Sequence, residues 1–476
     1  MLRLWMLVGF AAIVGQAGQE PTKPPADEYK EKLENVKKNL AEEHVKIGEY
    51  LNGVSMHRWA RDEFRKAIGF IPDHAEARKK LGYKSKEGEW EPDPDAALET
   101  ENKKKNEEAA KIKSEYDKRI QKLGQTVARM WADIGNFCEK NKMKAEAEAA
   151  FRLAIEYDPT NGESRKKLGY VKQKEGPWLS KFEVAFRKQL KDNIAKAPSG
   201  APSKEETKAE QDLGWRHEKR KSPHFLFEVS GQKQDWLAEE LKHAESTYAM
   251  FHKLFDLKED LFSQPLNLVI VVSRPLHEAY VDKYNQGDSA QKEFSKKLGG
   301  MFGFPQCELV FDPKDKIIHE PVVHLTAQFL SEHLTGGRRP WLHEGTAFHF
   351  AMQTIGQGGT YCTNMAGTGS GQGERDYRNM ADWPLIVKTL IKDSKDPSML
   401  EVFKCKEWSE LSGAEAVKAW SLVDFLVTEH REKFKDFLSR IRGQREEDDE
   451  KMLMDVFGWT LEDFDTRWRT YARASY

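Results

Sequence analysis

Apolar residues recur at helical spacing over residues 28–196, where charged residues fill the positions between them. A spacing of three or four residues places apolar side chains on one face of a helix, which then packs against a neighbour. One such helix ends at Pro72, because proline cannot continue a helix. Its apolar positions are Ala60, Phe64, Ala67 and Ile68. We therefore predict an α-helical region over 28–196.

This helical region contains an internal repeat. Phe64 recurs as Phe151, an offset of 87 residues. A regular duplication predicts two copies of one structural unit, at about 40–90 and 127–178. We expect each copy to pair two helices, with a glycine in the first helix that lets the second approach closely. The other pairs at this offset are Gly48 and Gly135, Ala60 and Ala147, Ile68 and Ile155, and Pro72 and Pro159, and Trp90 matches Trp178 after the insertion of one residue.

The repeated units resemble tetratricopeptide-repeat helix pairs. They share a small residue in the first helix, Gly48, an Ala60 and a Phe64 in the second helix, and the closing Pro72. The resemblance implies a groove that binds a peptide or a partner protein. The alternative is that these apolar positions only form the core between the helices, and for Phe64 and Ile68 we expect this.

The second half of the chain has a different pattern. Residues 197–223 are rich in Pro, Ser, Gly and charge, which is typical of a linker. Short β-branched and apolar runs then replace the helical spacing. We predict strands at 225–229, 266–272 and 308–311. Because the chain after Pro321 is mainly helical again, this order of elements favours an α+β domain over 224–476.

The N-terminus has the pattern of an export signal. Arg3 precedes a short apolar run over 4–14, and the small residues Gly15 and Ala17 follow it. The run is shorter than the roughly 20 residues that span a bilayer, so we predict a secretory signal peptide over 1–18. We expect an exported protein, periplasmic or extracellular in a bacterium, with no membrane span after cleavage.

The amino-acid composition restricts the classes of partner that the protein is expected to bind. The 76 Lys and Arg against 78 Asp and Glu give a net charge of -2, without the basic excess of a nucleic-acid binder. We therefore expect no nucleic acid partner. Four cysteines are too few for a dense disulfide framework. In an exported protein these four either pair or remain free thiols, and they are Cys138, Cys307, Cys362 and Cys405.

Candidate chemistry concentrates between residues 319 and 349, which hold five of the 14 histidines. His319 and His324 are five residues apart, or about 140° around a helix. A His-Glu-x-x-His zinc motif needs both imidazoles on one face. Pro321 also fits a first helical turn, which would leave His319 outside the helix. We therefore reject this pair as a zinc motif.

A second register is similar to a known family. His324-Leu325-Thr326-Ala327-Gln328, followed by Trp341-Leu342-His343-Glu344-Gly345, resembles the peptidase-MA-like, gluzincin-type metallopeptidases. That family carries His-Glu-x-x-His on one helix and, about 20 residues later, a Trp-Leu-x-Glu-Gly motif whose Glu is the third zinc ligand. In bacteria such domains are often fused to tetratricopeptide repeats. Over 225–471 the resemblance implies an α+β fold, with 303–311 as the edge strand beside the active site.

The sequence departs from this family where catalysis is performed. His324 aligns with the first zinc ligand and Glu344 with the third. However, Leu325 stands at the general-base position and Gln328 stands where the second zinc histidine belongs. Zinc hydrolysis needs three protein ligands and a carboxylate that moves the proton. We therefore expect His324 and Glu344 to be vestigial metal positions that are hydrogen-bonded to each other.

The sequence thus favours a non-catalytic relative of these enzymes that binds a protein or peptide, through the helical repeats or the former substrate cleft, and needs no cofactor. The alternative is an active zinc-dependent metallopeptidase with an atypical site. In that case zinc is the cofactor, and His319, His343 or His349 would replace the missing ligand. However, helical geometry directs His343 and His349 away from the face that carries Glu344.

Overall fold

The structure is a computed structural model that describes residues 24–86, 88–93, 106–173, 178–230, 236–301, 303–311, 318–356, 377, 379–444 and 449–476. The predicted signal peptide and Cys362 lie outside the described residues. The chain divides into two compact units, Met1–Lys172 and Gln173–Tyr476. Within the described ranges, no helix has both the length and the apolar character that crossing a membrane requires.

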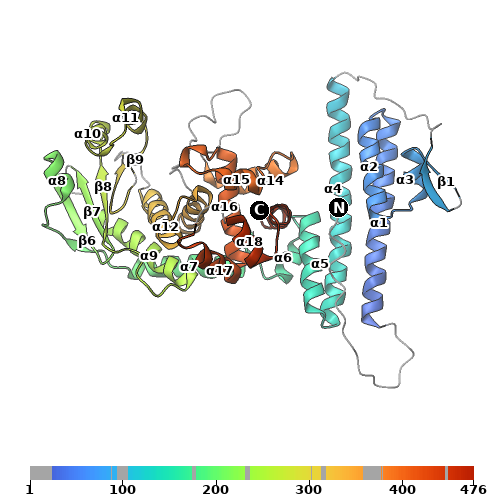
Figure 1. Cartoon of the computed structure of the whole chain (residues 1–476). Helices are drawn as coiled ribbons and strands as arrows, with labels where there is room; N and C mark the ends of the chain where they lie inside the picture. The colour runs from blue at the N-terminus through green and yellow to red at the C-terminus, as the bar shows by residue number, and fades with distance from the viewer. Residues whose placement is uncertain are drawn as a thin grey trace, which may run out of the picture. The chain divides into compact units, whose positions relative to one another are not determined.

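The first unit is built from two copies of one arrangement (Figure 1). The first copy comprises α1 (Pro25–Gly53), α2 (His57–Phe70), α3 (Ala75–Lys80), β1 (Tyr83–Lys86) and β2 (Glu89–Pro92). The second copy comprises α4 (Asn106–Lys140), α5 (Lys144–Tyr157), α6 (Gly162–Lys167) and β3 (Val171–Lys172). Equivalent turn residues, Ser55 and Lys142, both adopt a φ of 62°. The repeat in the sequence therefore corresponds to a repeat in the structure.

The glycine of each copy has the expected packing role. A Cβ atom at Gly48 in α1 would lie 2.6 Å from Cε1 of Phe64 in α2. The equivalent distance from Gly135 in α4 to Phe151 in α5 is 2.5 Å. Real Cβ atoms do not approach so closely, so only glycine admits the phenylalanine ring. Both rings are buried, and each fixes the seam between its two helices.

Polar contacts also join the two copies. The Glu63 carboxylate in α2 is buried, and its Oε2 atom lies 2.7 Å from Nδ1 of His44 in α1. The hydroxyl of Tyr116 in α4 donates to the other oxygen of Glu63 at 2.9 Å. This contact ties the second copy to the first.

The second unit contains a sheet that, among the described residues, has six strands in the order β5-β6-β7-β8-β10-β9. The central strands β7, β8 and β10 are parallel, and the outer pairs are antiparallel. Their bounds are β5 (Ala201–Pro202), β6 (His217–Lys221), β7 (Phe225–Ser230), β8 (Leu266–Val271), β9 (Gly300–Met301) and β10 (Gln306–Val310). The three predicted strands are present as β7, β8 and β10.

Alternation along the central strands gives the sheet two different faces. One face enters the main core with Phe227 of β7, Leu268 of β8 and Leu309 of β10. The opposite face carries Val269 and Val271 of β8, which pack with residues of α8 (Lys208–Leu213) and α10 (Arg274–Tyr284). Because both faces are covered, the parallel strands are mostly apolar, as such strands usually are.

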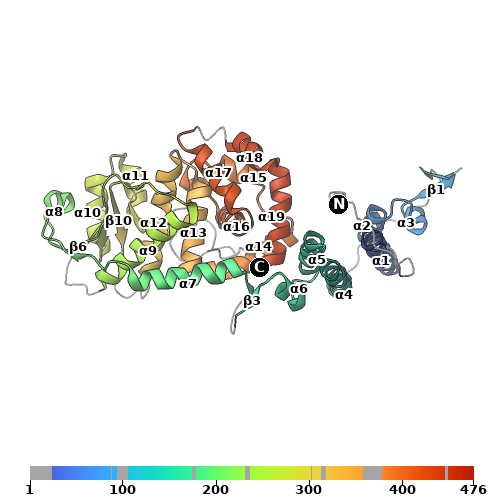
Figure 2. The same cartoon turned by 90° about the horizontal axis from the view of Figure 1, so that it is seen from below.

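Helices cover the core side of the sheet and continue away from it (Figure 2). Helix α9 (Leu237–Phe255) packs between the sheet and α12 (His319–Thr335), and α12 packs on α13 (Pro340–Thr354). Helix α13 in turn packs on α16 (Gly413–Glu429). The remaining elements are β4 (Trp178–Leu179), α7 (Lys181–Lys196), α11 (Ser289–Ser295), η2 (Met380–Asp382), α14 (Trp383–Lys392), α15 (Met399–Lys404), η3 (Trp408–Glu410), α17 (Arg431–Ile441), α18 (Asp449–Phe457) and α19 (Leu461–Ser475). The coarse α+β organisation after a helical region is thus present.

Three sequence-based boundaries need correction. Residues 197–223 are not a linker, because β5, α8 and β6 lie within them and two of these are strands of the sheet. The helical region does not extend to 196, since α7 packs on α9 and α13 through Phe186 and Leu190. The strand at 303–311 is not the edge strand, because β9 pairs with the outer side of β10.

The cysteines in the described residues are free. Cys138, Cys307 and Cys405 are all buried and form no disulfide. Burial raises the pKa of the Cys138 thiol to about 11 and that of Cys405 to about 12. These thiols are therefore protonated and unreactive at neutral pH.

Candidate functional site

The helical hairpin α12–α13 brings the family-like motifs together. The turn between the helices contains Gly336 and Gly337, both with positive φ. Arg339 then fixes the start of α13 through a buried ion pair from its Nε atom to Asp449, at 2.8 Å. Gly345 explains the last position of the Trp-Leu-x-Glu-Gly motif, because a Cβ atom there would lie 2.5 Å from the Ala419 carbonyl of α16. The glycine of this motif therefore has a packing role.

His324 and Glu344 are in contact, as the sequence predicts. The Nε2 atom of His324 lies 3.4 Å from Oε2 of Glu344, and neither side chain has any exposed surface. The ring of Phe348 packs edge-on against the imidazole with 4.9 Å between ring centres. The pair is therefore enclosed in the core rather than open to solvent.

The two substituted positions are occupied by groups that suit a closed core. Leu325 is buried in the main apolar cluster. The amide of Gln328 donates to Oε1 of Glu332, one turn further along α12, at 3.1 Å. Burial, together with the nearby charge of Glu344, raises the pKa of Glu332 to about 7 despite that hydrogen bond. Leu325, which the resemblance aligns with the general base, therefore brings no carboxylate to this position.

The other histidines of α13 have partners elsewhere. His343 contacts the hydroxyl of Thr335 through Nε2 at 3.0 Å, and burial, together with Arg339, lowers its pKa to about 3. His349 lies 3.2 Å from Asp424 of α16. Neither is therefore placed as a replacement ligand beside Glu344, in agreement with the helical geometry.

Asp424 is the centre of a second buried polar cluster. It accepts hydrogen bonds from the hydroxyls of Tyr471 at 2.8 Å and Tyr476 at 2.9 Å. Burial alone would raise the pKa of Asp424, but these bonds and His349 outweigh it, so the pKa lies below its usual value. The cluster holds α13, α16 and the C-terminal residues together, which is a structural role.

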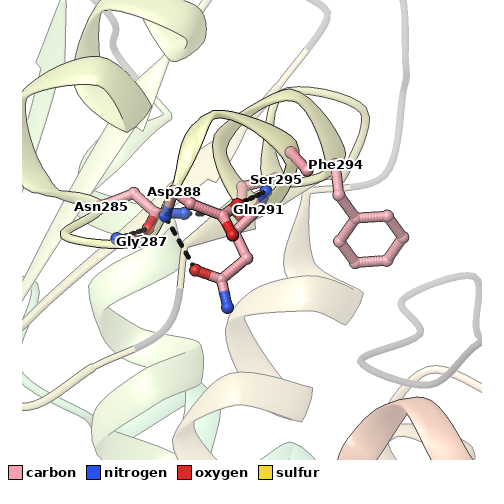
Figure 3. Close-up of a pocket in the computed structure, with 7 residues that line it drawn as sticks. Asn285, Gly287, Asp288, Gln291, Phe294 and Ser295 are labelled. Carbon is pink, nitrogen blue, oxygen red and sulfur yellow. Dashed lines mark hydrogen bonds between the residues drawn. The ribbon is translucent and has the colours of Figure 1, made fainter.

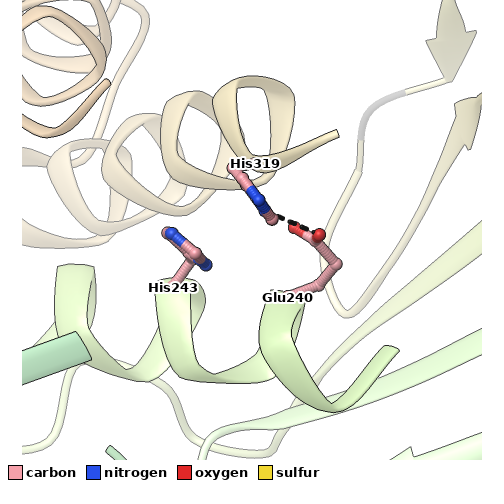
Figure 4. Close-up of side chains that lie close together, drawn as sticks. All are labelled: Glu240, His243 and His319. Atoms are coloured by element: carbon pink, nitrogen blue, oxygen red, sulfur yellow. Dashed lines mark ion pairs between the residues drawn. The ribbon is translucent and has the colours of Figure 1, made fainter. Parts of the chain in front are cut away.

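His319 has a different environment from the one expected. It is the first residue of α12, not a residue outside the helix, and its Nδ1 atom lies 2.7 Å from Oε1 of Glu240 in α9. Its ring stacks on His243 of α9, with 4.2 Å between ring centres and 13° between planes. Figure 4 shows the three side chains converging from the two helices. Ligand atoms of Glu240, His243 and His319 lie within 4.8 Å of one another, so this trio could hold a metal ion.

Sequence reasoning missed this trio. The signal available was Glu-x-x-His at 240–243, which places both side chains on one face of a helix. The third residue, His319, lies 76 positions after His243 in the sequence. It comes close to the other two only because α12 packs on α9.

Two cavities in the described part of the chain are lined by neither His324 nor Glu344. One, of about 600 Å³, lies beside α11 and is shown in Figure 3. Its polar groups bond one another, since Asp288 and Gln291 form the capping box of α11 and Asn285 accepts from the Gly287 amide. The other, of about 420 Å³, lies beside α17.

Comparison with known proteins gives no assignment: no protein-family model matches the chain, and no curated protein is significantly similar to it.

Proposed function

We propose that the chain is an exported protein- or peptide-binding module, related to gluzincin metallopeptidases, whose metallopeptidase-like half does not hydrolyse peptides. The observation that carries the proposal is the α12–α13 hairpin. There His324 faces Glu344 at 3.4 Å, both are fully buried, and Leu325 takes the place of the general base. Loss of a general base alone costs on the order of 10²–10⁴-fold in rate.

The donor set at this hairpin also fits zinc poorly. A zinc site needs three good protein ligands and a position for water. His324 and Glu344 supply two, and the Gln328 amide, which contacts Glu332, is a weak substitute for imidazole. Phe348 packs against the His324 imidazole, and neither His324 nor Glu344 has exposed surface. Among the described residues, a substrate therefore has no open path to the pair.

Binding is assigned to the duplicated helical region because that region is a repeated helix pair. Repeats of this kind expose an extended surface while each seam is closed internally. Here Phe64 and Phe151 close the seams, so the outer faces of the helices remain for a partner.

A gain-of-ligand experiment tests the relation to gluzincins. The double variant Leu325→Glu with Gln328→His rebuilds the family motif around His324 and Glu344. It should take up about one more zinc per chain than the wild type, measured by elemental analysis after dialysis. Leu325→Glu alone is the matched control and should gain none. Equal zinc content in both variants would contradict the proposed relation.

A peptide experiment separates binding from catalysis. The full chain is incubated with a degenerate peptide library, and retained and cleaved peptides are identified by mass spectrometry. Retention of a peptide subset without cleavage is expected. Chelator-sensitive cleavage that Glu344→Ala abolishes would establish the alternative, an active zinc metallopeptidase. Neither retention nor cleavage would contradict peptide binding.

A further inference from the structure

The Glu240–His243–His319 trio differs from two other buried Glu–His pairs of the second unit, those of Glu228 and Glu308. Glu228 is saturated, since it accepts from Thr207 and Asn267 and contacts His217. Glu308 likewise contacts His277 and accepts from the Met301 amide. Such complete bonding is what a structural buried carboxylate requires.

Glu240 is not saturated in this way. It is fully buried, and in the described part of the chain its one polar contact is the ion pair with His319. Neither of its oxygens has a conventional hydrogen bond there. Burial accordingly raises the pKa of Glu240, although His319 opposes the shift. A buried carboxylate with spare acceptor capacity favours a cation beside it.

His243 is oriented as metal-binding histidines usually are. Its Nδ1 atom lies 3.0 Å from the Glu239 carbonyl of its own helix, to which it donates. That bond fixes the proton on Nδ1 and leaves a lone pair on Nε2. Ordered in this way, the imidazole of His243 presents Nε2 as a ligand beside Glu240, one helical turn away.

His319 supplies the third ligand and an access route. Its side chain is 37% exposed, whereas Glu240 is fully buried, so an ion could enter from the His319 side. Tetrahedral zinc at ~2.0 Å from each ligand would hold the ligand atoms about 3.3 Å apart. The ligand atoms lie within 4.8 Å of one another. The rings of His243 and His319 are stacked with 13° between their planes, so His319 must turn out of the stack before both imidazoles face one ion.

We propose that Glu240, His243 and His319 bind a first-row divalent cation of the zinc class, at a site separate from His324 and Glu344. Two imidazoles and one carboxylate suit zinc rather than Mg²⁺ or Ca²⁺, which prefer oxygen ligands. With three protein ligands, a fourth position remains for water or an external ligand on the exposed side. The ion joins α9 to the first turn of α12.

The test uses the full chain, stripped with a chelator and dialysed against micromolar zinc. The wild type should retain about one zinc per chain by elemental analysis, and cobalt in its place should give the visible absorption of a tetrahedral site. Zinc, but not Mg²⁺, should raise the melting temperature of the stripped protein.

Single variants locate the ion. His319→Ala and His243→Gln should each raise the zinc Kd by more than the roughly 10–100-fold that an outer-shell substitution costs. His319→Ala alters a partly exposed residue, and an unchanged circular dichroism spectrum identifies folded protein. His324→Gln, accepted only when its circular dichroism spectrum is also unchanged, is the matched control on the same helix and should leave the zinc content unchanged.

The outcomes distinguish this proposal from the proposed function. Zinc-free wild type at micromolar free zinc, with no shift in melting temperature, overturns the site. Zinc that persists in His319→Ala and His243→Gln but disappears in His324→Gln also overturns it, and contradicts the non-catalytic function as well. Zinc that disappears only in the first two variants supports the site and leaves the proposed function intact.

Discussion

Nε2 of His324 and Oε2 of Glu344 are 3.4 Å apart, and neither side chain has exposed surface. The contact between the two groups therefore offsets part of the free-energy cost of removing them from water. Removing one member leaves the other without its partner in a medium of low dielectric constant. Such a loss typically costs about 3–5 kcal/mol.

We therefore expect His324→Ala and Glu344→Ala each to lower the free energy of unfolding by several kcal/mol. The double variant should cost less than the sum of the two, by about 0.5–3 kcal/mol, because the penalty for an unpaired group is then absent. Urea unfolding of the four proteins measures this. Strict additivity would show that the contact carries no coupling energy.

At the seam between α1 and α2 we expect Gly48→Ala to destabilise the protein, which is the opposite of the usual effect of a Gly→Ala substitution in a helix. In an exposed helix, Gly→Ala stabilises by about 1 kcal/mol. At Gly48 the new Cβ would meet Phe64 at 2.6 Å, so we expect a net loss of about 1–3 kcal/mol from overpacking. Gly53→Ala in the same helix is the control, since a Cβ atom there meets nothing within 4 Å.

Thermal unfolding of both variants checks this prediction. Gly53→Ala should be neutral or slightly stabilised, and Gly48→Ala clearly destabilised. Adding Phe64→Leu to Gly48→Ala should recover part of the loss if the ring is the obstacle. Equal behaviour of Gly48→Ala and Gly53→Ala would contradict the packing role of Gly48.

Because the pKa of Glu332 is raised, we expect the free energy of unfolding to fall as the pH rises from about 4.5 to 7. Its pKa in the folded protein is about 7, above the usual 4.5, because it is largely buried and near Glu344. The folded state therefore holds a proton that the unfolded state has released. The resulting stability is fully present below about pH 4.5 and is lost as the pH rises through 7.

Glu332→Gln removes this dependence. Relative to the wild type, the variant should gain about 1–3 kcal/mol between pH 4 and pH 8. Unfolding by urea at the two pH values gives the comparison, and the exposed Glu278→Gln serves as a control. A difference between wild type and Glu332→Gln that does not change with pH would refute the shifted pKa.

His343 predicts the opposite dependence at acid pH. Its pKa is lowered from 6.5 to about 3 by burial and by Arg339, so the unfolded state binds the proton first. Its contribution to stability is present above about pH 6.5 and is lost as the pH falls towards 3. The slope is at most about 1.4 kcal/mol per pH unit.

In His343→Gln this slope should be shallower over the same range, whatever the variant's stability at pH 7. Unfolding free energies at half-unit steps of pH provide the measurement. Identical slopes in the two proteins would mean that His343 titrates normally.

The strands of the core could be predicted because short apolar, β-branched runs are a strong sequence signal for a buried strand. The runs at 225–229 and 266–272 became β7 and β8. By contrast β6, His-Glu-Lys-Arg-Lys, carries no apolar residue. Its inward position, Lys219, is buried by an ion pair with Glu210, and such pairing is not visible in a hydrophobic pattern. This is why the segment resembled a linker.

The two candidate sites also differ in how far they could be predicted from the sequence. The contact of His324 with Glu344 followed from two motifs on successive helices. The trio of Glu240, His243 and His319 depends on the packing of α12 on α9, which local sequence does not encode. Helix α7 is a further case, since its apolar face at Phe186 and Leu190 could serve either unit.

The duplication of the helix pair has a consequence for cooperativity. Within each copy the two helices contact each other along an interlocked seam, whereas α1 and α4 contact one another less extensively. Free energy in such an array divides into terms for each copy and a smaller term for their junction. The first unit is therefore expected to open first between its copies, so its amide protons should exchange at two levels of protection rather than one.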